Sequence, residues 1–208
     1  MIHIVEGLGE PAEQPLLESM FEDRKRLFID LLDWDLTVVD DRLEIDRFDD
    51  AYATYIVAAD HCGRHLASMR LLPSTRPHLL GTLFERLCTN GVPVGRDIFE
   101  ITRLCLPANL LKHERRRLRD GLIRAMVDHA LDRGIRRFTG VVTARFREQI
   151  LAMGWDGEAL GPGQDLGGGR LGAFAVTIAD DTPAQLEANG LLALPDFAAA
   201  TLAAGSAA

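Results

Sequence analysis

Charged side chains stand at a regular spacing in the first half of the chain. Asp46 and Asp49 are three residues apart, as are Glu100 and Arg103, which lie in an apolar run over 99–106 that is typical of a buried strand. A buried carboxylate or guanidinium is costly unless it is paired or used. A carboxylate can also take a proton from an attacking amine. Taken alone, the pattern favours a structural ion pair over a catalytic one.

These four residues belong to a longer ordered set of charged and aromatic side chains. The set consists of Arg24, Phe28, Trp34, Asp46, Asp49, Arg70, Glu100 and Arg103. Its order and spacing resemble those of the acyl-homoserine-lactone synthases, the LuxI-type autoinducer synthases. The resemblance covers roughly residues 20–155.

The resemblance implies an acyltransferase that makes a quorum-sensing signal. Such an enzyme transfers an acyl chain from an acyl thioester to the amine of S-adenosylmethionine, then closes the lactone and releases 5′-methylthioadenosine. It implies catalytic roles for Glu100, Asp46 and Arg103, with Glu100 as first and Asp46 as second candidate for the base. Backbone N–H groups around Arg103–Leu106 are candidate oxyanion donors. S-adenosylmethionine is a substrate here, so we expect neither cofactor nor metal. No enzyme nucleophile is required, and we see no Ser/His/Asp or Cys/His set.

By the same resemblance, five residues bind S-adenosylmethionine and close a lid over it: Arg24, Phe28, Trp34, Asp49 and Arg70. Phe28 follows Arg24 by four residues, so the two share a helix face. An aromatic ring over a sulfonium is a sensible contact, and Arg70 would hold the lid acids or a substrate carboxylate. Without the resemblance, core packing is the better interpretation of Phe28 and Trp34.

The resemblance also suggests where the acyl chain lies, namely against Phe84, Gly140, Val142 and Thr143. Many members that take 3-oxo donors have Thr where this chain has Gly140, which offers no side-chain hydrogen bond. We therefore expect an unsubstituted or 3-hydroxy chain, and the small residues leave room for a longer one. Phe84 matches a family Phe and is expected to be structural.

Charge is distributed unevenly along the chain. Residues 112–147 contain eleven Lys or Arg and four Asp or Glu, in a protein of net charge −8. A local anionic partner is one explanation, and a solvated helix face is an equal one. We expect Arg116 and Arg119 to dock acyl carrier protein, with the phosphates of coenzyme A as the alternative. Nucleic acid is disfavoured by the acidic remainder, and no run is apolar enough to span a membrane.

Two other functions stay open at this point. One is a general N-acetyltransferase-fold enzyme that uses acyl-CoA and another amine. Such enzymes have an Arg/Gln-x-x-Gly-x-Gly/Ala loop that binds pyrophosphate, but residues 107–114 contain no glycine. The other is a non-enzymatic module that docks a carrier protein, which the intact charged set argues against.

The order of elements predicts an α/β protein with a mixed sheet and helices on both faces, an N-acetyltransferase-like α-β-α sandwich. We expect one domain over 1–197 and a disordered Ala-rich tail over 198–208. Three cysteines without pairing suit a reducing cytoplasm, as does the absence of a signal-peptide pattern. The expected elements are a helix at 13–33, a mobile lid at 35–50, strands at 52–59 and 64–72, a helix at 77–88, a strand at 97–106, a helix at 112–133, a strand at 137–142, a helix at 143–153 and strands at 156–166 and 171–178.

Overall fold

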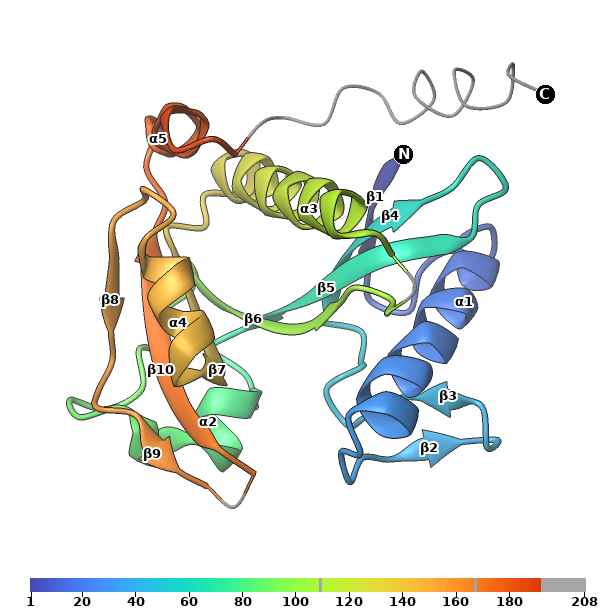
Figure 1. Cartoon of the computed structure of the whole chain (residues 1–208), viewed down its shortest axis with the longest axis horizontal. Coiled ribbons are helices and arrows are strands. Elements are labelled where there is room, and N and C mark those ends of the chain that lie inside the picture. The colour runs from blue at the N-terminus through green and yellow to red at the C-terminus, as the bar shows by residue number, and fades with distance from the viewer. Residues whose placement is uncertain (109, 167, 192–208) are drawn as a thin grey trace. The chain divides into compact units, whose positions relative to one another are not determined.

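The computed structural model describes residues 1–108, 110–166 and 168–191, which divide into two compact units (Figure 1). The described part of the first unit comprises Met1–Arg70 and Arg103–Ala125, and the second comprises Leu71–Thr102 and Met126–Leu191. Three elements have residues in both units, and they are β5 (His65–Pro73), β6 (Ile98–Cys105) and α3 (Lys112–Arg133).

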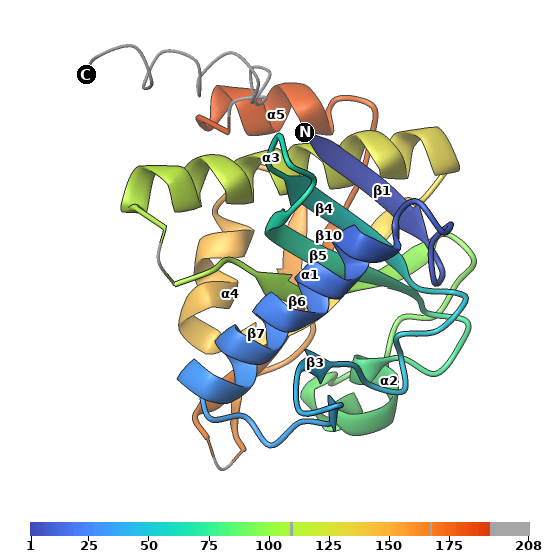
Figure 2. The same ribbon diagram turned by 90° about the vertical axis from the view of Figure 1, so that its right-hand side faces the viewer.

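The first unit is a sheet with a long helix beside it. Its remaining elements are β1 (Ile2–Glu6), α1 (Gln14–Arg24), η1 (Lys25–Leu31), β2 (Val38–Val39), β3 (Leu43–Glu44) and β4 (Thr54–Ala59). β1 pairs antiparallel with β4, which is next to β5. α1 runs past this sheet in Figure 2 and contacts the β2–β3 hairpin through β3. The charged residues of this unit therefore come from a helix, a hairpin and strands that pack together.

The expected elements of this unit are largely confirmed, with two corrections. The helix at 13–33 forms, but after Arg24 it continues as the wider π-helical turns of η1. The hairpin of β4 and β5 forms as expected. The segment at 35–50 is not simply a loop, because it contains the short strands β2 and β3. The sequence analysis also missed β1, whose five residues carry no turn signal of their own.

The second unit holds a mixed sheet. Its elements are α2 (Leu79–Leu83), η2 (Glu85–Leu87), β7 (Arg137–Thr143), α4 (Ala144–Leu151), β8 (Gly157–Ala159), β9 (Gln164–Asp165), β10 (Arg170–Thr177) and α5 (Thr182–Ala188). β6 runs parallel to β7, while β10 runs antiparallel to β7, β8 and β9. The mixed sheet confirms the expected α/β class. The short α5 was not expected from the sequence.

Helices cover both faces of β7 and β10 (Figure 1). The Arg147 side chain of α4 lies over Gly172 of β10, where a Cβ would come within 2.6 Å of its Nη1. The next residue, Ala173, packs instead with Leu80 of α2 and Leu87 of η2. Because neighbouring side chains on a strand point to opposite faces, α4 covers one face and α2 with η2 covers the other. This arrangement confirms the expected layers within the second unit.

The extent of the domain stays a prediction, and the expected tail at 198–208 lies outside the described residues. Within the described residues, no helix is both long enough and apolar enough to cross a membrane.

Candidate active site

The first unit gathers six charged side chains into one ion-pair network. Its members are the guanidiniums of Arg24, Arg70 and Arg103 and the carboxylates of Glu44, Asp46 and Asp49. They come from α1, β5 and β6 and from the chain at and just after β3. Three positive and three negative charges balance, which is what burial of such groups requires. The sequence predicted five of these six.

Asp49 is the most fully bonded carboxylate of this ion-pair network. Arg24 donates from Nη1 and Nη2 to its two oxygens, each at 2.9 Å. The Tyr55 hydroxyl donates to Oδ1 at 2.9 Å, and Arg70 Nη1 lies 2.7 Å from the same oxygen. Burial opposes ionisation of Asp49, but Arg24 and then Arg70 outweigh it and hold its pKa well below the usual range. Burial raises the pKa of the Tyr55 hydroxyl, and the negative charge of Asp49 raises it further. Asp49 is therefore a fixed anion that joins α1 to β5.

Asp46 is held by two arginines but remains partly accessible. Arg70 donates to both of its oxygens, at 2.7 and 3.0 Å, and Arg103 Nη2 donates to Oδ2 at 2.7 Å. The backbone N–H of Phe48 donates to Oδ1 at 2.8 Å. Its side chain is 13% exposed, whereas those of Glu44 and Asp49 are at most 1% exposed. Asp46 is therefore the carboxylate of this network that a ligand can approach.

Glu44 is the member that the sequence analysis missed. It accepts from Arg24 Nε at 2.6 Å and from Arg103 Nη2 at 3.0 Å, and it is completely buried. The available signal was its place two residues before Asp46, since alternate residues of an extended chain share a face.

The two expected aromatic residues lie together. The rings of Phe28 and Trp34 stack with centroids 5.0 Å apart and planes 13° apart. Phe28 is buried, Trp34 is 47% exposed, and the Arg103 guanidinium lies 5.7 Å from the centre of the Phe28 ring. A stacked pair with one exposed indole offers a flat apolar surface beside the ion-pair network.

Arg103 adopts an unusual backbone conformation. Its φ is +49°, in the left-handed region that non-glycine residues rarely adopt. The alternation of buried and less buried residues along β6 also breaks there. Glu100 and Thr102 are buried two residues apart, but the next buried residue is Cys105, three residues further on. In a regular strand, side chains alternate and residues 100 and 103 would face opposite sides of the sheet. This alternation is interrupted at Arg103 itself.

In the second unit, Glu100 binds the start of α2. Its side chain is completely buried, and it accepts hydrogen bonds from the backbone N–H groups of Leu79 at 2.7 Å and Leu80 at 2.8 Å. These are the first two N–H groups of α2, which no intrahelical carbonyl can satisfy. Burial, with a contribution from the Glu100 charge, raises the pKa of the Cys88 thiol. Glu100 therefore fixes where α2 begins.

The four residues expected to line an acyl pocket are divided between the two faces of β7. Gly140 and Val142 pair with residues on the α4 face, and a Cβ on Gly140 would meet Phe174 at 2.8 Å. Phe84 packs into the cluster on the α2 face. The Thr143 hydroxyl accepts a hydrogen bond from the Phe146 N–H and caps the start of α4. Of the four, Gly140 and Val142 share a surface.

The expected docking residues on α3 differ in accessibility. Arg116 is 65% exposed and lies 3.6 Å from Asp120, a loose ion pair. Arg119 is 27% exposed and donates to the same carboxylate at 2.9 and 2.6 Å. Arg116 is therefore the more available of the two for a partner.

The structure contains a Ser/His/Asp arrangement that the sequence analysis did not find. His65 Nδ1 lies 2.8 Å from Asp23 Oδ2, and its Nε2 lies 3.0 Å from Ser68 Oγ. Ser68 is buried, so its hydroxyl cannot reach a substrate, and the arrangement is structural. Among the described residues, no group of three or more His, Cys, Asp or Glu side chains is placed to hold a metal ion.

Comparisons with known proteins find relatives over most of the chain. A family model described as autoinducer synthase matches residues 10–185. An acyl-homoserine-lactone synthase of Ralstonia nicotianae is 31% identical over 178 residues, which cover 83% of this chain and 87% of the relative.

Two solved structures show the fold. A CoA-dependent acyl-homoserine lactone synthase, BjaI, determined with SAM and isopentyl-CoA, superposes with a TM-score of 0.79 at 23% identity, covering 91% of this chain and 87% of that one. An acyl-CoA N-acyltransferase from Pseudomonas aeruginosa superposes with a TM-score of 0.59 at 13% identity, covering 86% and 99%. The expected N-acetyltransferase-like fold is confirmed. The chain therefore belongs to the autoinducer synthase family, the acyltransferases that make acyl-homoserine lactones.

Proposed function

We propose that this acyl-homoserine-lactone synthase binds S-adenosylmethionine against the ion-pair network and the Phe28–Trp34 stack. The observation that carries the proposal is the partial exposure of the Asp46 carboxylate, in a network whose other two carboxylates are buried. Asp46 would receive the substrate ammonium, and the exposed Trp34 would lie against the adenine or the sulfonium. Arg24, Asp49 and Arg70 would hold this surface rigid. The SAM named in the BjaI structure supports the choice of substrate.

The amine must lose a proton before it attacks the acyl thioester. Asp46 accepts hydrogen bonds from two guanidiniums, and both Glu100 oxygens accept N–H groups. Neither carboxylate is well placed to take a proton. An α-amine has an ordinary pKa of roughly 7.7–8.0, so a useful fraction is neutral near neutral pH. We therefore assign Asp46 to binding the substrate amine and Glu100 to positioning the start of α2. The proton of the amine is released to solvent.

The remaining steps need geometry more than acid–base chemistry. The tetrahedral oxyanion would be met by backbone N–H groups at Arg103–Leu106, where the left-handed residue interrupts the regular strand. The Arg103 side chain holds Asp46 in place. The methionine carboxylate then attacks its own γ-carbon, and the sulfonium leaves as 5′-methylthioadenosine. This ring closure depends on a folded substrate conformation.

For the acyl donor, we propose an unsubstituted or 3-hydroxy chain, because Gly140 has no side chain that could donate a hydrogen bond to a 3-oxo group. The room that the sequence suggested over Gly140 is occupied by Phe174. Arg116, near the exposed start of α3, supports acyl carrier protein as donor, whereas the isopentyl-CoA of the BjaI structure supports coenzyme A. The cysteines Cys62, Cys88 and Cys105 are free, which supports a cytoplasmic location.

Mass spectrometry of the purified protein with S-adenosylmethionine tests the proposal. Acyl-CoA and acyl-carrier donors of several chain lengths, each with and without a 3-oxo group, are supplied in parallel. We expect an acyl-homoserine lactone and methylthioadenosine in equal amounts. We expect Asp46→Asn to raise KM for S-adenosylmethionine much more than KM for the donor. Free thiol from acetyl-CoA and another amine, without lactone, would instead establish a general N-acyltransferase.

A further inference from the structure

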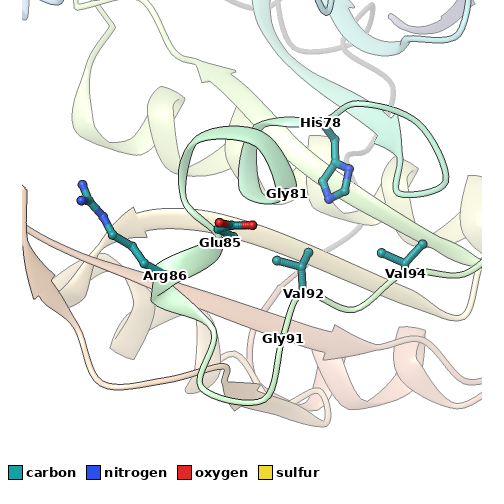
Figure 3. Close-up of a pocket in the computed structure, with 7 residues that line it drawn as sticks. All are labelled: His78, Gly81, Glu85, Arg86, Gly91, Val92 and Val94. Carbon is teal, nitrogen blue, oxygen red and sulfur yellow. The ribbon is translucent and has the colours of Figure 1, made fainter.

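A surface pocket of about 490 Å³ lies in the second unit, formed by α2, η2 and the chain at 91–94 (Figure 3). It is lined by His78, Gly81, Glu85, Arg86, Gly91, Val92 and Val94. None of these residues belongs to the ion-pair network or to the set assigned to the acyl chain. The two valines and two glycines give it an apolar wall.

The His78 ring presents an unpartnered acceptor to this pocket. His78 is 4% exposed, and its Nδ1 lies 2.8 Å from the Arg76 carbonyl oxygen. A carbonyl only accepts, so Nδ1 carries the proton and Nε2 of the neutral ring is an acceptor. Nε2 is buried and has no hydrogen-bond partner among the described residues. Such an atom costs roughly 1–3 kcal/mol, which a ligand with an N–H donor would recover.

Gly81 packs directly against that ring. A Cβ at position 81 would lie 3.0 Å from His78 Nε2 and 2.7 Å from Cε1. A side chain at position 81 would therefore displace the ring, so Gly81 fixes where His78 lies in the pocket. Figure 3 shows the His78 ring directed toward the middle of the lining residues.

The charged side chains of the pocket favour a cation. Glu85 makes no ion pair among the described residues, and Figure 3 shows its carboxylate beside Val92, within the ring of lining residues. The Arg86 guanidinium extends away from the other lining side chains in the same view. The pocket therefore offers two acceptors, one of them anionic, against an apolar wall.

We propose that this pocket binds a small primary ammonium carrying an aliphatic chain. The ammonium donates to Glu85 and to His78 Nε2, and the chain lies against Val92 and Val94. This ligand is distinct from S-adenosylmethionine, whose proposed place is in the first unit, so the inference stands independently of the proposed function.

Binding of n-hexylammonium, followed by NMR of the backbone amides of the full chain, tests the proposal. We expect saturable shifts at Gly81, Gly91 and Val92. Hexyltrimethylammonium has the charge without N–H donors and should bind about tenfold more weakly or worse, and hexanoate should not compete. Equal binding of the trimethyl analogue, or shifts confined to other residues, would overturn the proposal.

Variants locate the contacts. Glu85→Gln removes the charge from an exposed side chain and should weaken binding by about tenfold. Glu148→Gln makes the same change on α4, outside the pocket, and should leave binding unaltered. His78→Phe keeps the ring and removes the acceptor, and it should weaken binding as well. If Glu85→Gln and Glu148→Gln bind alike, the pocket does not hold an ammonium.

Discussion

The ring of Phe174 occupies the space into which any side chain at position 140 would project. An ideal Cβ on Gly140 would lie 2.8 Å from the Cε1 and Cζ atoms of that ring, which is buried. The two residues stand opposite each other in the antiparallel register of β7 and β10. The Phe174 ring therefore fits in the sheet only because position 140 has no side chain.

This pair predicts how a threonine at position 140 behaves. Gly140→Thr inserts three heavy atoms against a buried ring, and overpacking of this kind costs about 1–3 kcal/mol in the free energy of unfolding. Adding Phe174→Leu to Gly140→Thr should recover part of that loss, because the two sites are coupled. Urea unfolding of the single and double variants measures both effects.

The same substitution at an open position is the matched control. A Cβ on Gly168 would meet nothing within 4 Å, so Gly168→Thr should change the unfolding midpoint little. If Gly140→Thr is as mild as Gly168→Thr, or if Phe174→Leu gives no recovery, the two residues are not coupled.

The hydrogen bonds of Glu100 predict a positioning role with a measurable signature. Glu100→Gln replaces one acceptor oxygen by an amide that cannot accept, so the N–H of Leu79 or Leu80 loses its partner. The expected loss of stability is roughly 1–3 kcal/mol, accompanied by a lower kcat. Because the proton goes to solvent in our proposal, the acidic limb of the kcat–pH profile should remain in this variant. Disappearance of that limb would make Glu100 the base.

The depressed pKa of Asp49 predicts acid sensitivity. Its native pKa lies below the unfolded value of about 3.9, so its ion pairs contribute fully above that pH. The contribution is lost as pH falls below about 4 toward the native pKa. We expect the free energy of unfolding to drop steeply there, and chemical denaturation at successive pH values measures it.

Two variants test whether Asp49 is responsible for this loss of stability in acid. Asp49→Asn leaves Arg24 and Arg70 buried with less compensation, so it should be less stable at neutral pH by about 3–5 kcal/mol and show a shallower fall in acid. Asp156→Asn changes an exposed aspartate and should retain the full slope. Parallel curves for Asp49→Asn and the unaltered chain would assign the acid sensitivity to other groups.

The sequence alone was sufficient to predict those features that follow from the energetic cost of burying a charged side chain. Arg103 within an apolar strand had to be paired, and in the structure its partners are Asp46 and Glu44. Glu44 was missed because its bond to Arg24 depends on how β3 packs against α1, twenty residues away in the chain. The same holds for Phe174, which meets Gly140 only through the strand register.

The backbone of Arg103 was likewise unpredictable from spacing. Alternation assumes a regular strand, and a left-handed residue interrupts it. Glu100 was the first candidate for the base by resemblance, and that role stays a prediction. The structure adds that both of its oxygens accept N–H groups of a short helix. The residue types indicated that a partner must exist, and only the fold identifies the partner.

The accessibility of α3 predicts which arginine serves a carrier protein. Arg116 is exposed and loosely paired, whereas Arg119 donates twice to Asp120. Arg116→Glu should therefore raise the apparent KM for an acyl-carrier donor more than Arg119→Glu does, with KM for S-adenosylmethionine unchanged. Because surface charge attraction is screened, the difference should shrink at high salt.

Arg64→Glu, on the exposed β4–β5 turn, is the control for charge reversal elsewhere. Steady-state kinetics with acyl-carrier and acyl-CoA donors measures each variant. An unchanged carrier KM in Arg116→Glu would remove α3 from the docking site.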